Sequence, residues 1–253
     1  MDTQQALFTY CLRLADNSLV LGNRLSEWCG HAPILEEDLA LANIALDKIG
    51  QARTLFQYAG EVEGKGRSED DLAYRRSERE FFNTLLAELP KGDFAFTIVR
   101  QLLNDTFDQL LYRALSNSKD ETLKAFAVKS LKEVDYHVRH INQWMLRLGD
   151  GTEESHRRVQ QALDDLWPYS GELFEMDEVD RIMISEGIGV DLNELRAPWN
   201  KAIQDILTEA TLTQPEDGWM HTGGKREGRH SEHLGFMLAE MQFLPRAYPD
   251  AKW

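Results

Sequence analysis

The sequence predicts an all-α protein of 253 residues that folds as a single domain. Apolar residues recur at intervals of three and four along most of the chain, which is the spacing of one helix face, and strand-like alternation is scarce. Short segments rich in Gly, Pro or Ser separate these stretches, and no Pro-rich linker or low-complexity tract divides the chain. We therefore expect a helical bundle core over about 3–149, extended by further helices over about 152–253.

The first two predicted helices are separated by a break at residues 30–33. Pro33 disfavours a helical conformation at the residue before it. The second helix opens on three acidic residues, 36–38, which suit the positive N-terminal end of a helix. Each helix carries one polar residue on an otherwise apolar stripe, Ser18 in the first and Lys48 in the second.

Turn-forming residues mark the ends of the later helices. A polar, glycine-rich connector at 60–70 precedes a short helix that ends at 90–92, and Ser-Asn-Ser at 116–118 separates two long helices. Gly-Asp-Gly at 149–151 ends the second of these, and four shorter helices follow. The nine expected helices cover residues 3–28, 34–60, 71–88, 93–116, 120–148, 153–167, 176–186, 191–211 and 231–246.

The composition narrows the classes of partner. A net charge of −15 argues against nucleic acid or an anionic membrane as the main target, because both select for basic surfaces. No apolar run reaches the roughly 18 residues of a membrane span, and no signal peptide is visible. Cys11 and Cys29 would lie roughly 27 Å apart on one straight helix, too far for a disulfide. We expect a cytoplasmic protein.

Two helical segments resemble metal-binding helices that lack most of their ligands. Four-helix-bundle di-iron proteins carry a Glu-x-x-His pair on each of two helices and one carboxylate on each of the other two. At the Glu-x-x-His positions, this chain has Lys48 with Gln51 in one segment and Val134 with His137 in the other. A chain that keeps such helices without the ligands is expected to support a catalytic partner.

Lys48 is open to two interpretations. Burial of a lysine is costly unless it is paired, so Lys48 would occupy a vacated metal site and pair with Asp105. Alternatively, its side chain reaches the surface, or the helix is rotated by one position. Asp105 would then be an ordinary solvated carboxylate, and Asp108, one turn away, would fit this description equally well.

A rival hypothesis is an autonomous metalloenzyme with an iron or manganese ion. Its ligands would be Asp105, Glu133, His137 and His140. Histidines three residues apart share a helix face, but a metal site needs three or four ligands from converging elements. A hydrogen-bonding role for the two histidines is the more common outcome. A helical scaffold without any link to oxygenase chemistry is a further alternative.

Residues 221–235 concentrate glycine and positive charge in an otherwise acidic chain. The segment lacks the spacing of a phosphate-binding P-loop, so it predicts no nucleotide site. One interpretation is a loop whose backbone N–H groups contact an anion, and the favoured one is a turn that packs against a neighbouring subunit. The residues expected at this contact are Gly223, Gly224, Lys225, Arg229, His230 and His233.

No nucleophile elbow or dinucleotide fingerprint is present, but several segments carry a family resemblance. They are RLADNSLVLGNRLSEWCGHAP, LALANIALDKIGQAR, KEVDYHVRHINQWMLRLGDGT, DEVDRIMISEGIGVD and TGGKREGRHSEHLGFMLAEMQFL. In this order they resemble the C-type subunits of bacterial phenylacetyl-CoA epoxidases over nearly the whole chain. The resemblance implies a ferritin-like four-helix bundle with additional C-terminal helices.

The resemblance also implies partners. The multicomponent enzyme epoxidises the aromatic ring of phenylacetyl-CoA with O₂ and reducing equivalents from NADPH. Its A-type subunit holds the di-iron centre, its reductase carries FAD and iron–sulfur, and its C-type subunit is regarded as structural and non-catalytic. We therefore expect no cofactor in this chain, pairing with the A-type subunit and with other epoxidase subunits, and self-association as a further option.

As part of the resemblance, the A-type ligand pattern can be carried over residue by residue. Only Asp105 and His137 keep a ligand type, and the glutamates that would bridge two metal ions are replaced. The overlay favours burial of Lys48, whose ammonium group opposes cation binding. The six degenerate positions are Ser18, Lys48, Gln51, Asp105, Val134 and His137.

Overall fold

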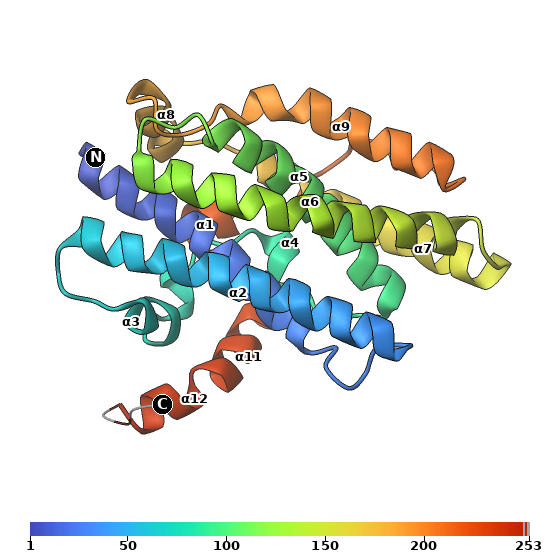
Figure 1. Cartoon of the computed structure of the whole chain (residues 1–253), viewed down its shortest axis with the longest axis horizontal. Helices are drawn as coiled ribbons and strands as arrows, with labels where there is room; N and C mark the ends of the chain where they lie inside the picture. The colour runs from blue at the N-terminus through green and yellow to red at the C-terminus, as the bar shows by residue number, and fades with distance from the viewer. Residues whose placement is uncertain (250, 252–253) are drawn as a thin grey trace.

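Four long helices form the body of the computed structural model, which describes residues 1–249 and 251 (Figure 1). Helices α1 and α2 pack along most of their lengths, as do α5 and α6, and α2 also contacts α6. The described residues contain no strand. The long helices are α1 (Thr3–Ser26), α2 (Leu35–Glu63), α5 (Phe94–Leu115) and α6 (Glu121–Gly149).

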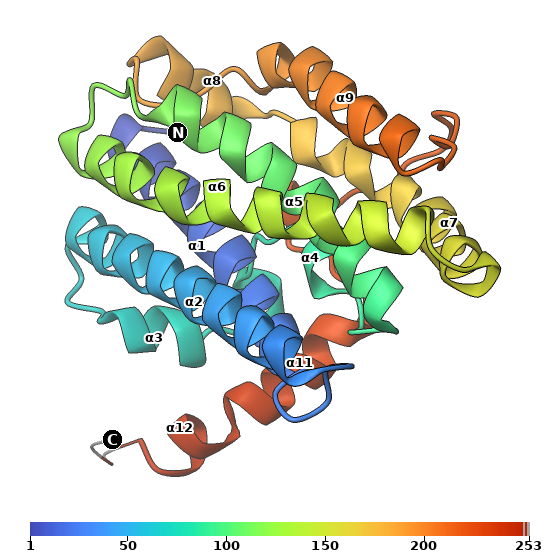
Figure 2. The same ribbon diagram turned by 45° about the vertical axis from the view of Figure 1, so that its right-hand side comes forward.

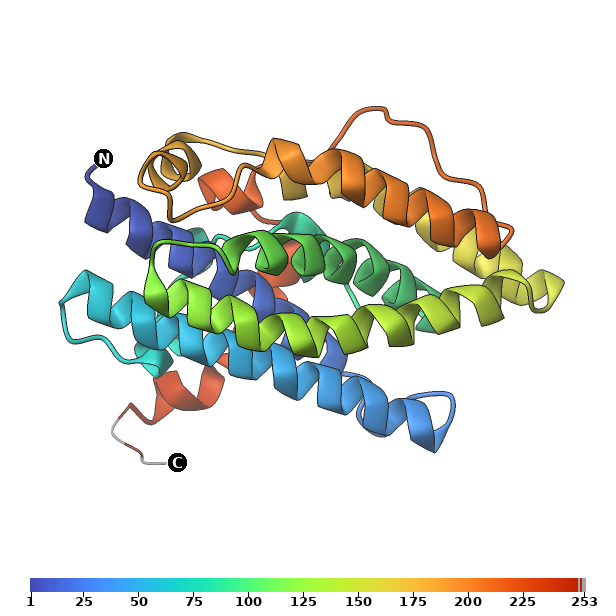
Figure 3. The same ribbon diagram turned by 45° about the horizontal axis from the view of Figure 1, so that its top comes forward.

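Shorter helices pack against all four long helices, with α3 on α2. Helix α7 packs on α5 and α6, α8 packs on α1, and α9 lies along α5 and α6 (Figure 3). Helices α11 and α12 form an arm at the edge of the bundle (Figure 2). These elements are α3 (Glu69–Tyr74), η1 (Glu78–Glu80), α4 (Leu85–Glu88), α7 (Glu153–Leu166), η2 (Trp167–Phe174), α8 (Glu178–Ser185), α9 (Leu192–Glu209), α10 (Gly224–Glu227), α11 (Glu232–Met241) and α12 (Phe243–Ala247).

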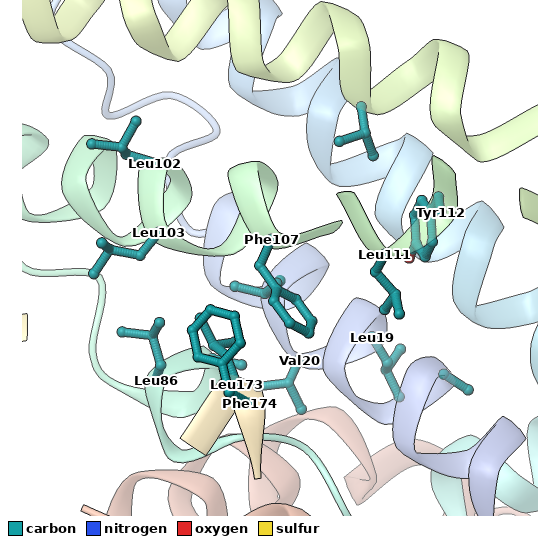
Figure 4. Close-up of a cluster of buried hydrophobic side chains, with 14 of the residues drawn as sticks. Leu19, Val20, Leu86, Leu102, Leu103, Phe107, Leu111, Tyr112, Leu173 and Phe174 are labelled. Carbon is teal, nitrogen blue, oxygen red and sulfur yellow. The ribbon is translucent and has the colours of Figure 1, made fainter. Parts of the chain in front are cut away.

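One continuous hydrophobic cluster joins the long helices to the C-terminal helices. Phe107 of α5 meets Phe174 of η2 edge to face, with ring centroids 5.4 Å apart (Figure 4). Phe174 in turn contacts Trp199 of α9, whose indole N–H donates to the Leu103 carbonyl at 3.0 Å. The aromatic side chains therefore hold the C-terminal segment against α5.

The all-α prediction is confirmed, and seven of the nine expected helices lie within three residues of their predicted ends. The single helix expected over 71–88 is wrong, because three short helices occupy that stretch. Arg76 is buried between them, where its guanidinium pairs with Asp16 and donates to the Glu80 carbonyl at 2.6 Å. Ser77 then begins a new turn through a capping box with Glu80.

The helix expected over 231–246 is interrupted at Gln242, which separates α11 from α12. The buried Gln242 amide donates to the carbonyls of Ala73 and Arg76, at 3.3 and 3.0 Å, and so ties the arm to the short helices. The elements η2 and α10 were not predicted from the sequence. No helix in the described part of the chain combines the length and the apolar character needed to cross a membrane.

Candidate functional site

Lys48 lies at the centre of the bundle and is fully buried. Its ammonium nitrogen donates a hydrogen bond to Asp108 at 2.6 Å and forms an ion pair with Asp105 at 2.8 Å. Burial lowers the pKa of Lys48, but the two carboxylates raise it more strongly, and its pKa lies above the usual lysine value. Lys48 is therefore a charged group inside the protein and does not reach the surface.

Both carboxylates come from α5, one helical turn apart, so they point toward α2 together. Asp105 is fully buried and Asp108 is nearly so. Burial raises the pKa of Asp108, and the neighbouring Lys48 opposes this shift. The arrangement is one cation held between two anions, which leaves the cluster with a net charge near −1 when all three are ionised.

His137 is buried beside this cluster, but its main partner is Asp47, which was not predicted. Its Nε2 atom lies 2.9 Å from Asp47, and its Nδ1 atom lies 3.9 Å from Asp105. Asp47 immediately precedes Lys48, so one turn of α2 supplies a carboxylate to α6 and an ammonium group to α5. The adjacent Asp47 and Lys48 are the feature of the sequence that could have indicated these two contacts.

The remaining degenerate positions serve the interior in different ways. Gln51 donates to Glu133 at 3.0 Å and accepts from the Tyr112 hydroxyl at 3.3 Å, while Val134 is a fully buried apolar residue. Ser18 lines a cavity of about 40 Å³ with Asp108 and Tyr112. The structure thus brings all six positions to the inside of the bundle.

These residues do not fit a di-iron centre. A metal ion in this position would meet the ammonium group of Lys48, and the carboxylates that remain are already paired with it. His137 turns its Nε2 atom toward Asp47. Within residues 1–249 and 251, no three His, Cys, Asp or Glu side chains are grouped in a way that could hold a metal ion.

The four ligands of the rival metalloenzyme hypothesis also have separate partners. Glu133 accepts from Gln51, and His140 lies 2.8 Å from Glu37, a second α2 residue that was not anticipated. His140 also stacks on Tyr136. This geometry favours hydrogen bonds between α2 and α6 as the role of the two histidines.

The glycine-rich segment does contact an anion through its backbone, and that anion is the protein's own Glu172. The N–H groups of Gly223 and Lys225 donate to Glu172 at 3.1 and 3.0 Å, and the N–H of Leu85 donates at 2.7 Å. Burial raises the pKa of Glu172, and these N–H groups oppose the shift. The expected external anion would therefore compete with an internal carboxylate.

Other residues of the segment also contact the same chain. The buried Lys225 ammonium donates to the Glu175 carbonyl at 2.8 Å, and burial lowers its pKa to about 8. His230 lies 2.7 Å from Glu88. A Cβ atom on Gly224 would lie 2.6 Å from the Asn83 carbonyl oxygen, so glycine is needed there. Arg229 is exposed and pairs with Glu227, and His233 accepts at its carbonyl from Arg24.

The fold and the buried cluster define a ferritin-like helical protein whose interior holds an ion pair of Lys48 with Asp105 and Asp108. Comparison with known proteins supports this class. The chain belongs to the family of phenylacetic acid catabolic proteins, whose family model matches residues 1–253. It is 50% identical over 247 residues to the C-type subunit of the 1,2-phenylacetyl-CoA epoxidase of Escherichia coli (strain K12). The alignment covers 98% of this chain and 99% of that relative, and the resemblance seen in the sequence is confirmed.

Proposed function

We propose that this chain is a structural, non-catalytic subunit of a multicomponent phenylacetyl-CoA 1,2-epoxidase that acts in aerobic phenylacetate degradation. In this proposal it pairs with a di-iron catalytic subunit in the cytoplasm. A reductase with FAD and iron–sulfur supplies the electrons. The 50% identity to a C-type epoxidase subunit over nearly the whole chain supports membership of such a complex.

The single observation that carries the non-catalytic role is the buried ion pair of Lys48 with Asp105 and Asp108. A di-iron oxygenase needs anionic ligands that converge on one point, because they must balance the charge of two metal ions. Here two interior carboxylates are instead paired with an ammonium group that belongs to the protein. In this proposal the lysine takes the place of a metal ion.

The contribution of such a subunit would be architectural. A helical bundle whose buried carboxylates are paired with its own lysine offers a packed surface against which the helices of a second bundle can lie. Helices that present metal ligands must be held close to their productive geometry, and a packed neighbour restricts their movement. We propose that this chain provides that support to its catalytic partner.

Co-expression with a di-iron catalytic subunit of such an epoxidase tests the pairing. We expect a stable complex by size-exclusion chromatography, and we expect epoxidation of phenylacetyl-CoA by the complex with reductase and NADPH to exceed that of the catalytic subunit alone. Absence of a complex at micromolar concentrations would contradict the proposal.

Metal analysis of the chain purified alone from iron-supplemented cells tests the non-catalytic role. We expect iron and manganese well below one ion per chain, both in the wild type and in His137→Ala. Near-stoichiometric metal that disappears in His137→Ala would instead support the metalloenzyme hypothesis.

A further inference from the structure

Helix α2 has apolar residues on two opposite faces, although only one of them is buried. On the inward face, Leu41, Ile44 and Leu55 are at most 1% exposed. On the outward face, Leu35, Leu39 and Leu46 are 72, 58 and 66% exposed. A surface helix of a globular protein normally carries polar residues on its solvent side, and a helix that is apolar on both sides is normally buried on both sides.

The outward residues form one narrow stripe, which consists of Leu35, Leu39, Ala42 and Leu46. At about 100° per residue, these four positions fall within an arc of about 60°, and the stripe is about 17 Å long. Their spacing of four, three and four residues is that of a seam between two packed helices. In Figures 1 and 3, α2 lies on the outside of the bundle, and the exposure of its three outward leucines shows that no described residue covers them.

We propose that this α2 outer stripe is the docking surface for an amphipathic helix of the catalytic subunit. The inference rests on the proposed function, because that function supplies the partner. The spacing of the stripe fits a helix better than a loop or a strand, since knobs at alternating intervals of three and four match the holes on a second helix.

The negative charge beside the stripe favours a different protein, and not a second copy of this chain, as the binding partner. The segment 35–46 holds no Lys or Arg, and Glu36 and Asp38 flank the stripe with negative charge at its N-terminal end, whereas the buried Glu37 faces His140. A second copy would bring the same acidic flank and the same net charge of −15 to the interface. The fitting partner helix therefore carries apolar residues on one face and basic residues beside them.

The double variant Leu39→Glu/Leu46→Glu tests this surface in the co-purified complex. Both side chains are exposed, so we expect the isolated variant to keep the wild-type circular dichroism and Tm. We expect its affinity for the catalytic subunit to fall at least about 100-fold, because both substitutions place a charge within the apolar stripe. The matched control is Phe243→Glu/Leu244→Glu on α12, whose side chains are 65 and 49% exposed.

The outcomes separate the two proposals. If the wild-type chain does not bind the catalytic subunit, the proposed function fails. If the wild type binds but the stripe variant binds equally well, or the control loses as much affinity, only the docking surface is refuted. A wild-type homodimer that the stripe variant dissociates would assign the stripe to a second copy and overturn the inference. A photo-crosslinking residue at position 46 gives a second test, since it should capture the catalytic subunit and one at position 244 should not.

Discussion

Replacing Lys48 by methionine removes the cation from the buried cluster while keeping a side chain of similar length. Asp105 and Asp108 then face each other, without a counter-charge, in an interior where their exposures are 0 and 5%. Burial already raises the pKa of Asp108, and loss of Lys48 raises it further. The folded variant must hold an unpaired buried carboxylate or take up a proton.

The cost follows from the geometry of the cluster. Lys48 has contacts of 2.8 and 2.6 Å to two carboxylates, and all three groups are removed from water. Breaking a buried pair by removing one partner typically costs about 3–5 kcal/mol. For a chain of this size, 1 kcal/mol corresponds to about 2–4 °C in Tm, so we expect Lys48→Met to lower the Tm by about 6–20 °C.

Thermal unfolding followed by circular dichroism at pH 7 measures this change. The matched control is Lys201→Met, which breaks an exposed ion pair with Asp205 of almost the same length, 2.7 Å. Exposed pairs contribute less than about 1 kcal/mol, so this control should stay close to the wild type. Adding Asp105→Asn and Asp108→Asn to Lys48→Met should recover much of the loss. A Tm for Lys48→Met within about 1 °C of the Lys201→Met value would refute the argument.

Three further predictions test other parts of the structure. Glu172→Ala removes the acceptor of three backbone N–H groups, so we expect a loss of about 3 kcal/mol and faster hydrogen exchange at those amides; unchanged exchange would contradict this. Lys225 has a pKa of about 8 when folded and about 10.4 when unfolded, so the unfolded chain binds more protons between these values. Between pH 8 and 10, the free energy of unfolding measured with urea should therefore increase more for the wild type than for Lys225→Met. An equal pH dependence of the two proteins would contradict this prediction. Gly60→Ala would place a Cβ atom 2.4 Å from the Arg67 carbonyl oxygen and should cost about 1–3 kcal/mol, whereas Gly50→Ala, with open space around it, should be neutral or stabilising in the same assay.

The long helices could be predicted because their apolar periodicity extends over many turns and their ends carry turn-forming residues. The helices within 71–88 could not be predicted, because the path of this stretch depends on a contact with a distant residue. Arg76 leaves the helical pattern to pair with Asp16 of α1, sixty residues earlier in the chain. The capping pattern at Ser77 was present in the sequence, but whether a new helical turn begins there depends on that tertiary contact.

The candidate site was predictable only in part for a similar reason. The position of Lys48 on an apolar stripe allowed burial with Asp105 as its partner but left exposure at the surface equally open, and the family overlay favoured burial. The choice of Asp108 as a second partner depends on the rotation of α5 relative to α2, which periodicity alone does not fix. The contact of Glu172 with the N–H groups of Gly223 and Lys225 joins segments about fifty residues apart, and neither segment indicates the other.

The ion-pair cluster also explains why the bundle can exist without the ligands that its architecture suggests. Inward carboxylates such as Asp105 repel each other and lose hydration, so an interior that keeps them needs a source of positive charge. A metal ion is one source and a buried lysine is another, and the two are mutually exclusive at one position because they repel. Asp47 and His137 then tie α2 to α6 beside the cluster, as Lys48 ties α2 to α5. Lys48, Asp105 and His137 thus help to fix three helices to one another, which is the property that the proposed supporting role requires.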